Sequence, residues 1–495
     1  MSMAMPAPTG RDRRDLVRKF GWTSLASVVQ MLAGLASVII LTRFLVPTDY
    51  GIYGIALMAI AAGEVLTGGV LSSPIEQKAE VTRADLNSAF WANIGLALAC
   101  AAVTFPVAGL IARASGYEAA LPVIAAACLL MLITATGIVP DSLLRRRQAF
   151  RKLAKVGVAA ALSGLATGIV LAMMGAGVWS LIGFELVRRV ILVASNFTLA
   201  RWHPDGGLDV KAVRAALPFV SGMLAANALG RADRLAPQIA ATMLFGPEGL
   251  GLLSVATRIA DQIQSFVAQP VGAMALPVLS DAAREPGRFH ALMADSWRAI
   301  AIASFPMLAG FAAIAPLLVP LAVGDAFSSV GFISAITVLA NLRVVSSKVN
   351  IAATQAAGKA LIASASLAAS FAAHLLLLAV LAPLGVAAIA FASVLRGWLT
   401  WPLAAWFAKL TTGFAVTRQM AILVPPLAAS LAMAGVVYAL SGPVSAAFPT
   451  VIALVILILA GCLFYAFALW LADPWVRVWL ATGAFRRMLK KESVR

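Results

Sequence analysis

The chain of 495 residues has few charged residues, few histidines and few cysteines. Only 12% of it is charged and 61% is hydrophobic, whereas about 25% charged and about half apolar is usual for a soluble globular domain. This composition excludes a soluble domain. The three cysteines, Cys100, Cys128 and Cys462, lie in apolar stretches, and no pair has metal-ligand spacing. We therefore expect neither a metal site nor a disulfide.

Long polar segments and nucleotide-binding motifs are also missing. The longest connection that we expect between apolar stretches lies around 272–298, which is too short to fold alone. A membrane glycosyltransferase or polymerase would need acidic catalytic residues on a larger loop. No GxxxxGK[ST] loop occurs, so no ATPase is built in. The sequence thus predicts a protein that is not an enzyme and needs no cofactor.

The few histidines do not form a group. His203 and His290 fall in connections predicted to be cytoplasmic, and His374 lies alone in an apolar stretch. We interpret His374 as a hydrogen-bonded structural residue, with a proton relay as the alternative.

Apolar sequence is abundant and comes in runs of span length. A membrane-spanning helix needs about 20 apolar residues. Fourteen such stretches lie near 21–42, 51–71, 89–111, 121–143, 156–174, 178–199, 216–244, 249–271, 299–322, 330–353, 360–382, 385–407, 420–440 and 450–472. We therefore predict an all-α polytopic membrane protein with about 14 transmembrane helices.

The basic residues indicate the orientation. If the N-terminus is inside, 28 of the 38 Lys and Arg residues are cytoplasmic, and the opposite loops hold only Arg43 and Arg113. The positive-inside rule then predicts a multi-pass protein of the bacterial inner membrane with both termini cytoplasmic. We attribute the net charge of +17 to this topology and expect anionic membrane lipids, not nucleic acid, beside the basic runs. The first apolar stretch lacks a clear cleavage site, so we expect a retained helix rather than a signal peptide.

Charged side chains also fall inside the predicted spans, where one near the bilayer centre costs about 2.5–3.5 kcal/mol. There are twelve, namely Glu64, Glu185, Arg188, Arg189, Arg231, Asp233, Arg234, Arg258, Asp261, Arg343, Lys348 and Arg396. Eight are cationic and four are acidic. The surplus of positive charge predicts a cavity that favours an anion.

The chain contains an internal repeat at an offset of 200 residues. LTRFLVPTDYGIYGIALMAI aligns with ATMLFGPEGLGLLSVATRIA, so that Pro47 matches Pro247 and Gly51 matches Gly251. Six spans separate the copies, which preserves their direction across the membrane. The repeat predicts two six-helix lobes related by a pseudo-two-fold axis along the membrane normal, followed by two extra C-terminal helices. A chance match in a chain rich in Ala, Gly and Leu is the alternative.

This repeat sets the expected domain organisation. We expect a basic cytoplasmic arm (1–20), an N-lobe (21–200), a C-lobe (201–410), the two extra spans (411–472) and a basic cytoplasmic tail (473–495).

At the repeat and beyond it, the chain resembles a known family. The segments are TRFLVPTDYGIYG, TRADLNSAFWANIGLAL, GRADRLAPQIAATMLFGPEGLGLLSVATRIADQI, VGAMALPVLSDA, SFPMLAGFAAIAPLLVPLAVGDAF and TQAAGKA. They are similar to the oligosaccharide and polysaccharide flippases, the Wzx-type members of the multidrug/oligosaccharidyl-lipid/polysaccharide exporter superfamily. The resemblance covers most of residues 15–410. Ala326-Phe327 departs from the family, which often has Trp after the preceding Gly-Asp.

The resemblance implies a flippase that moves a lipid-linked oligosaccharide from the cytoplasmic to the periplasmic leaflet. The typical cargo is an undecaprenyl-pyrophosphate-linked repeat unit for lipopolysaccharide, capsule or exopolysaccharide. Transport would proceed by alternating access through a cationic central cavity, with H⁺ or Na⁺ as a possible coupling ion and polysaccharide assembly proteins as possible partners. The alternatives are a cation-coupled multidrug exporter of the same superfamily and a lipid II flippase.

Arginine suits a pyrophosphate because guanidinium groups pair with phosphate oxygens bidentately. Arg343 and Arg396 lie near the centres of predicted spans that contain no acidic residue, so they are the first candidates for substrate binding. An ion pair to another helix, or capping of backbone carbonyls, is the alternative for both. The other substrate-binding candidates are Arg231, Arg234, Arg188, Arg189 and Lys348. For Lys348, snorkelling to the interface is an equal alternative. The candidates for a coupling-ion site are Glu64 and Asp261.

Several of these charges have structural interpretations. Glu185 is placed at i+3 and i+4 spacing to neutralise one of Arg188 and Arg189, and Arg258 with Asp261 has similar spacing. Asp233 is expected in a structural ion pair.

Two further patterns concern packing. Gly164 and Gly168 form a small-xxx-small pattern that favours close helix contact. An interfacial aromatic belt is predicted from Trp179, Trp398, Trp401, Trp470 and Trp475.

Overall fold

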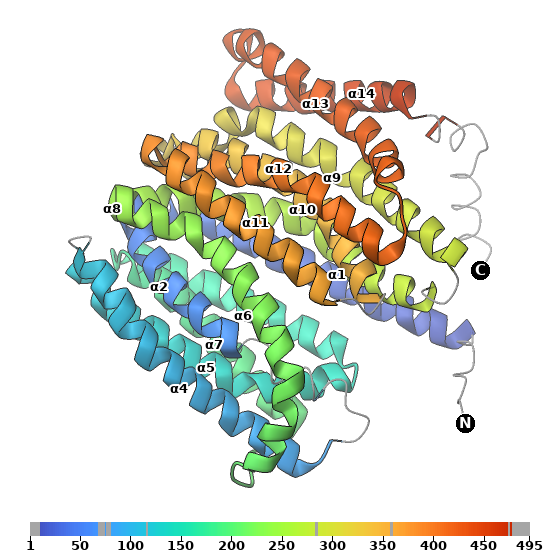
Figure 1. Cartoon of the computed structure of the whole chain (residues 1–495). Helices are drawn as coiled ribbons and strands as arrows, with labels where there is room; N and C mark the ends of the chain where they lie inside the picture. The colour runs from blue at the N-terminus through green and yellow to red at the C-terminus, as the bar shows by residue number, and fades with distance from the viewer. Residues whose placement is uncertain are drawn as a thin grey trace. The chain divides into compact units, whose positions relative to one another are not determined.

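The computed structural model describes residues 10–67, 75, 81–114, 117–282, 286–356, 360–473 and 476–477, and in these it contains helices and no strand (Figure 1). The α-helices are α1 (Gly10–Leu41), α2 (Pro47–Thr67), α4 (Arg83–Ala114), α5 (Leu121–Arg146), α6 (Phe150–Met173), α7 (Trp179–Ala200), α8 (Val210–Ala282), α9 (Pro286–Val323), α10 (Val330–Ala356), α11 (Ala360–Leu381), α12 (Val386–Thr412), α13 (Val416–Ala447) and α14 (Thr450–Ala472). Three short 3₁₀ turns are η1 (Glu118–Ala120), η2 (Asp325–Phe327) and η3 (Ala382–Leu384). The all-α prediction is confirmed.

Helix α8 contains two of the predicted spans. Gly246 interrupts it with φ 63° and ψ −166°, a left-handed conformation that glycine adopts without steric cost. Pro247 then opens the second part, where its missing N–H leaves no intrahelical bond unmade. With α8 divided at this break, each of the fourteen predicted spans coincides with a helical segment. Nine helices in the described ranges are long and apolar enough to cross a membrane, and the chain is a multi-pass membrane protein.

The stretch around 272–298, expected as a connection, lies between the candidate spans Ala228–Ser265 and Phe289–Val323, and helix ends extend into it. Helix α8 continues to Ala282, and α9 begins at Pro286. The polar residues in this stretch are mostly compatible with a helix, so their polarity marks the end of the apolar span and not the end of the helix. Pro286, at the first helical position, ends the connection.

The chain divides into two compact units, residues 1–254 and residues 255–495. In the first unit, alternate connections meet at the same end. Asp49, at the start of α2, lies against Gly177 in the α6–α7 turn, with its Oδ1 3.3 Å from where a Cβ would stand. The ring of Tyr117, in the α4–α5 connection, lies against Gly246, with its Cε2 3.4 Å from where a Cβ would stand. These turns therefore share one end of the unit.

The remaining connections of the first unit meet through arginine side chains. Arg146 Nη1 donates to the carbonyl of Ile75 at 2.9 Å, and Arg147 Nη1 donates to that of Ala200 at 2.7 Å. Arg146 ends α5 and Arg147 follows it, and their acceptors precede α4 and end α7. Spans that cross a membrane alternately bring their connections together in this way.

Residues 201–209, which connect α7 to α8, are fastened to the start of α4. Asp205 accepts hydrogen bonds from Asn87 Nδ2 at 2.9 Å and from Arg83 Nη1. Trp91 Nε1 donates to the carbonyl of Gly206 at 2.8 Å. The Asn87 hydrogen bond, followed by Arg83, holds the pKa of Asp205 below its ordinary value despite an opposing desolvation effect. We refer to these contacts as the α4 clasp.

Close packing of α6 on α7 confirms the small-xxx-small prediction. A Cβ on Gly164 would lie 2.8 Å from the carbonyl oxygen of Phe184, and one on Gly168 would lie 3.2 Å from the Cβ of Phe184. The two glycines, one turn apart, let the α7 backbone approach α6.

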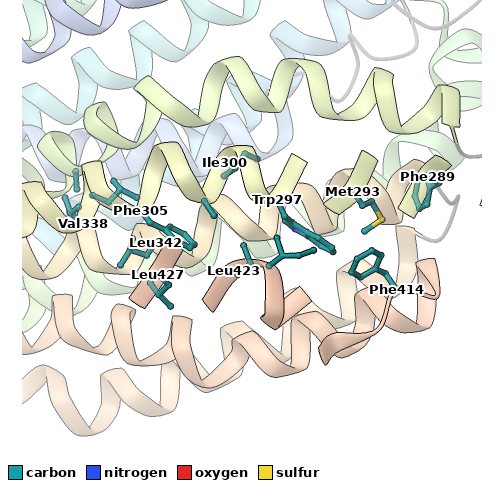
Figure 2. Packing of buried hydrophobic residues seen from close by; sticks show 14 residues of the cluster. Phe289, Met293, Trp297, Ile300, Phe305, Val338, Leu342, Phe414, Leu423 and Leu427 are labelled. Atoms are coloured by element: carbon teal, nitrogen blue, oxygen red, sulfur yellow. The ribbon is translucent and has the colours of Figure 1, made fainter. Parts of the chain in front are cut away.

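Large apolar side chains of α9, α10 and the α12–α13 region form the main core of the second unit (Figure 2). Trp297 is fully buried, and its ring meets that of Phe414 edge-to-face with centroids 5.0 Å apart. Leu342 of α10 is buried in the same core. Its neighbour Arg343 consequently leaves α10 in a different direction.

The two extra C-terminal helices pack on each other and on α9. Met433 and Val437 of α13 meet Ala309 and Ala313 of α9 in a second apolar cluster. Tyr465 of α14 donates its hydroxyl to the carbonyl of Ile302 on α9 at 3.0 Å. The outer side of α14 keeps large apolar side chains exposed, as a lipid-facing helix does. They are Val451, Ile452, Val455, Ile458, Leu459, Leu463, Phe467, Trp470 and Leu471.

The aromatic belt is only partly supported. Trp179 opens α7 and Trp470 lies near the end of α14, both substantially exposed. Trp398 and Trp401 instead lie in the middle of α12 against the main core, with ring centroids 5.5 Å apart. Being three residues apart, they share the helix face that points toward α9 and α13. Trp475 lies outside the described residues.

Replacing Gly164 with Ala tests the α6–α7 packing. We expect a loss of about 1–3 kcal/mol of stability, because the added methyl group must displace the backbone of Phe184. Thermal unfolding in detergent measures the effect. Gly95→Ala on α4 is the matched control, since no atom lies within 4 Å of its Cβ position. Equal melting temperatures for the two variants would contradict the close contact.

Acid should release the α4 clasp only at low pH. Folding lowers the pKa of Asp205 from its ordinary value of 3.8. The ionised Asp205 therefore stabilises the folded protein above pH 3.8, and this stability is lost as the pH falls through the lower pKa of the folded state. We therefore expect residues 201–209 to remain protected from hydrogen exchange down to about pH 4 in the wild type. Asn87→Ala should shift the release to higher pH. Ser88→Ala, which removes only the acceptor of the Asp209 N–H, should leave the midpoint unchanged.

Candidate functional site

Two of the predicted substrate-binding residues lie on helices of the second unit that pack on each other, Arg343 on α10 and Arg396 on α12. The Cδ atom of Arg343, on α10, lies 3.5 Å from where a Cβ would stand on Gly397 of α12. Arg396 precedes Gly397 on the same helix, and both arginine side chains are half-buried. The missing side chain at position 397 therefore leaves space for the Arg343 stem against α12, next in sequence to Arg396.

The two helices that carry these arginines, and α11 beside α12, contain no negative charge in their sequences. Helices α10, α11 and α12 contain Arg343, Lys348, Arg396 and Lys409 and no Asp or Glu. Helices α10 and α12 pack extensively on each other, as do α11 and α12. We call Arg343 and Arg396 with Gly397 the arginine pair site.

A row of polar contacts supports the arginine pair site from α11. Thr400 Oγ1 donates to the Arg396 carbonyl at 2.8 Å and lies 3.3 Å from Ser370 Oγ. One turn further, the buried His374 lies with Nε2 3.2 Å from Ser393 Oγ. His374 is thus hydrogen-bonded within the protein, as predicted. These contacts fix how α12 is rotated about its own axis against α11. They therefore also fix the direction in which the Arg396 side chain points away from α12.

Helix α8 contributes to the same region of the second unit. Asn341 Nδ2 donates to the carbonyl of Ala260 at 3.4 Å, which places this part of α8 beside α10. Arg258 is half-buried and Asp261 is exposed. Their local pairing and the coupling role of Asp261 stay predictions.

In the first unit, Glu185 binds both of its predicted partners. Its Oε2 lies 2.6 Å from Arg188 Nη2 and 3.2 Å from Arg189 Nε. Arg189 is 11% exposed and also donates to Thr134 Oγ1 on α5, whereas Arg188 is 32% exposed. One carboxylate cannot neutralise two cations, so Arg188, the more exposed one, carries the excess charge.

The remaining candidates lie on three helices. On α8, in the first unit, Arg231 and Asp233 are half-buried and Arg234 is exposed. The side chains of Glu64 on α2 and Lys348 on α10 lie outside the side chains that the structure describes.

Sequence reasoning missed Gly397 and Thr134. A signal for Gly397 was present, because glycine inside a helix costs about 1 kcal/mol relative to alanine and so marks a close approach. Thr134 lies on a different helix from Arg189, and no spacing rule connects them.

Comparison with known proteins agrees with this architecture. A family model described as "Polysaccharide biosynthesis protein" matches residues 40–331, more than half of the chain. The chain belongs to this family. The match confirms the resemblance seen in the sequence and includes both copies of the repeat.

Two relatives in the polysaccharide biosynthesis family have printed roles. The succinoglycan biosynthesis transport protein ExoT of Rhizobium meliloti is 25% identical over 302 residues, which are 61% of each protein. The lipopolysaccharide biosynthesis protein WzxC of Escherichia coli is 20% identical over 315 residues, 62% of this chain and 63% of WzxC. The matches therefore span about three fifths of these relatives.

Solved structures of two transporters share the fold of this family member. The lipid II flippase MurJ in an inward closed conformation has a TM-score of 0.71 at 15% identity, over 94% of this chain and 99% of MurJ. An inward-facing multidrug resistance MATE transporter of the MOP superfamily has a TM-score of 0.59 at 15% identity, over 80% of this chain and 99% of that one.

Removing the carboxylate of Glu185 should destabilise the first unit. Glu185→Gln leaves the buried Arg189 without its anionic partner, which costs about 3–5 kcal/mol when one member of a buried ion pair is lost. Thermal unfolding of the purified protein measures the loss. Asp141→Asn is the control, because the Asp141–Arg145 pair is more exposed and contributes about 0–1 kcal/mol. Similar small losses in both variants would contradict a buried pair.

Proposed function

We propose that the chain is a transporter, not an enzyme, that moves a lipid-linked oligosaccharide across the bacterial inner membrane. The cargo is an undecaprenyl-pyrophosphate-linked repeat unit, moved from the cytoplasmic to the periplasmic leaflet for surface polysaccharide or exopolysaccharide synthesis. The observation that carries this proposal is the arginine pair site, where two guanidinium groups lie on adjacent helices whose sequences contain no carboxylate.

The chemistry of the arginine pair site fits a pyrophosphate. A guanidinium group offers a planar fork of N–H donors that matches two phosphate oxygens, and hydrogen bonds between charged groups are about twice as strong as neutral ones. A cation kept at membrane depth is costly, so an anionic ligand offsets that cost when it binds. Arg188, Arg231, Arg234 and Lys348 would extend the cationic path.

The proposed orientation follows from the basic residues. Arg83, Arg146 and Arg147 lie at the end of the first unit where the α2–α4, α5–α6 and α7–α8 connections meet. The positive-inside rule makes this end cytoplasmic, together with both termini. Two six-helix lobes, 21–200 and 201–410, would then alternate access to the two leaflets, with Glu64 or Asp261 binding a coupling H⁺ or Na⁺.

The same observation weighs against a cation-coupled multidrug exporter. A cavity for a cationic drug needs carboxylates, whereas α10, α11 and α12 supply only cations. A lipid II flippase shares both the fold and a pyrophosphate-linked cargo. Rescue of a strain depleted of its lipid II flippase would favour that cargo over an oligosaccharide repeat unit.

Arg343→Ala and Arg396→Ala should each block export of the surface polysaccharide while the protein level stays normal. Losing charge-assisted hydrogen bonds worth about 1.5–3 kcal/mol should weaken headgroup binding about 10- to 100-fold. Export is measured in a host strain that lacks its own flippase. Lys409→Ala is the matched control, because it removes a positive charge from the exposed end of the same helix. Full export by both arginine variants would refute the anion-binding role.

A further inference from the structure

Arg343 and Asn350 lie on one face of α10. They are seven residues apart in sequence, which corresponds to about two helical turns and about 10.5 Å along the axis. The Cδ atom of Arg343 lies 3.5 Å from where a Cβ would stand on Gly397, so this face of α10 points toward α12. Asn350 therefore lies on the same side of α10, closer to the C-terminal end of the helix.

The amide oxygen of Asn350 is buried without being paired. Asn350 is 7% exposed, and its Oδ1 has no hydrogen-bond partner among the residues that the structure describes. Buried polar groups are nearly always paired, because an unpaired one carries the cost of desolvation with no bond to offset it. A leucine would fill the same position without that cost. The packing of α10 therefore does not account for an amide at position 350.

An unpaired donor lies on the facing side of α12. Trp401 follows Gly397 by four residues, so it lies one turn along the side of α12 that meets α10. Its ring packs against the main core, to which α10 contributes Leu342. The Nε1 atom of Trp401 is buried, and the described part of the chain provides no acceptor for it.

The unpaired acceptor and the unpaired donor lie on the same side of the Arg343–Gly397 contact. Helices α10 and α12 run in the same direction, since a single helix, α11, returns between them. Along that direction, Asn350 lies about 10.5 Å past the contact and Trp401 about 6 Å past it. Both groups therefore follow Arg343 along the seam between the two helices.

We infer that Asn350 and Trp401 form a saccharide subsite next to Arg343. This inference rests on the proposed function. A sugar hydroxyl both donates and accepts hydrogen bonds, so one ring can donate to Asn350 Oδ1 and accept from Trp401 Nε1. The spacing suits the sugar that is attached directly to the pyrophosphate, because the subsite begins within about two helical turns of Arg343.

Such a subsite would let the transporter distinguish a lipid that carries a sugar from one that does not. A neutral hydrogen bond changes affinity by about 2- to 10-fold. A polyprenyl pyrophosphate without a sugar would leave both groups unpaired, and sites built to pair with a hydroxyl reject ligands that lack it. The alternative is a structural role, in which the two groups serve only the packing of α10 on α12.

Lipid binding to the full-length protein in nanodiscs separates the two roles. The probes are undecaprenyl pyrophosphate and the same lipid carrying one hexose, glucose in one sample and galactose in another. The wild type should bind at least one hexose lipid about 2- to 10-fold more tightly than undecaprenyl pyrophosphate. Asn350→Leu should abolish this preference, and Trp401→Phe, which removes the indole N–H, should lower it. Arg343→Ala should weaken the binding of every probe.

Two residues on the same helices provide matched controls. Ser334 of α10 is fully buried, and within the described ranges its Oγ has no partner, but it lies nine residues from Arg343 and so on the opposite face. Ser334→Ala should therefore keep the hexose preference. Trp398→Phe removes an indole from the same core as Trp401 and should keep it too.

An unchanged hexose preference in Asn350→Leu would overturn the subsite, as would equal affinity of the wild type for all probes. Because Asn350 Oδ1 has no bond to lose, Asn350→Leu should not lower the melting temperature. A lower melting temperature with the same loss of affinity for every probe would indicate a structural role and also overturn the subsite. Failure of the folded wild type to bind any of the lipids would instead count against the proposed function, so the two failures are distinguishable.

Discussion

A bilayer offers no hydrogen-bond partner to a peptide group, and every other feature of this chain depends on how that constraint is met. Each backbone N–H and C=O at membrane depth must be paired within the protein, which leaves the helix as the available element for a single open chain. The helices then have nothing to gain from burying apolar surface against each other in lipid, so close contact must come from fit. Glycines at the α6–α7 interface, at the contact of Gly51 with Pro247 and at position 397 provide that fit.

The same constraint separates two classes of buried charge. Glu185 and Arg189 neutralise each other within one helix, and Thr134 accepts a further hydrogen bond. Opposite charges paired in this way compensate each other at membrane depth. Arg343 and Arg396 lie on helices whose sequences contain no carboxylate. Charges on such helices are the ones that the proposed function assigns to an anionic cargo.

Much of the fold was predictable because the length of each apolar run can be read directly along the sequence. The fourteen spans, the break at 245–248 and the Gly164–Gly168 contact follow from composition, from turn residues and from spacing along one helix. The features that the sequence did not predict are the helical ends in a polar stretch and the contacts between residues far apart in the chain. Helices α8 and α9 extend into the polar stretch around 272–298, and Trp398 and Trp401 pack against a core that no local pattern shows. At the candidate site, the local Glu185 pairs were predictable, whereas the proximity of Arg343 to Gly397 arises from the packing of α10 on α12.

The break at Gly246 concentrates the bending of a long helix into one pair of dihedral angles. From Val210 to Phe245, α8 is about 54 Å long at about 1.5 Å per residue. A rotation of about 10° at this residue would therefore carry the far end of the helix through about 9 Å while the end at the break hardly moved. The rest of this part of α8 is regular helix and therefore stiff. A small torsional change at Gly246 would consequently become a large displacement at the opposite end of the helix.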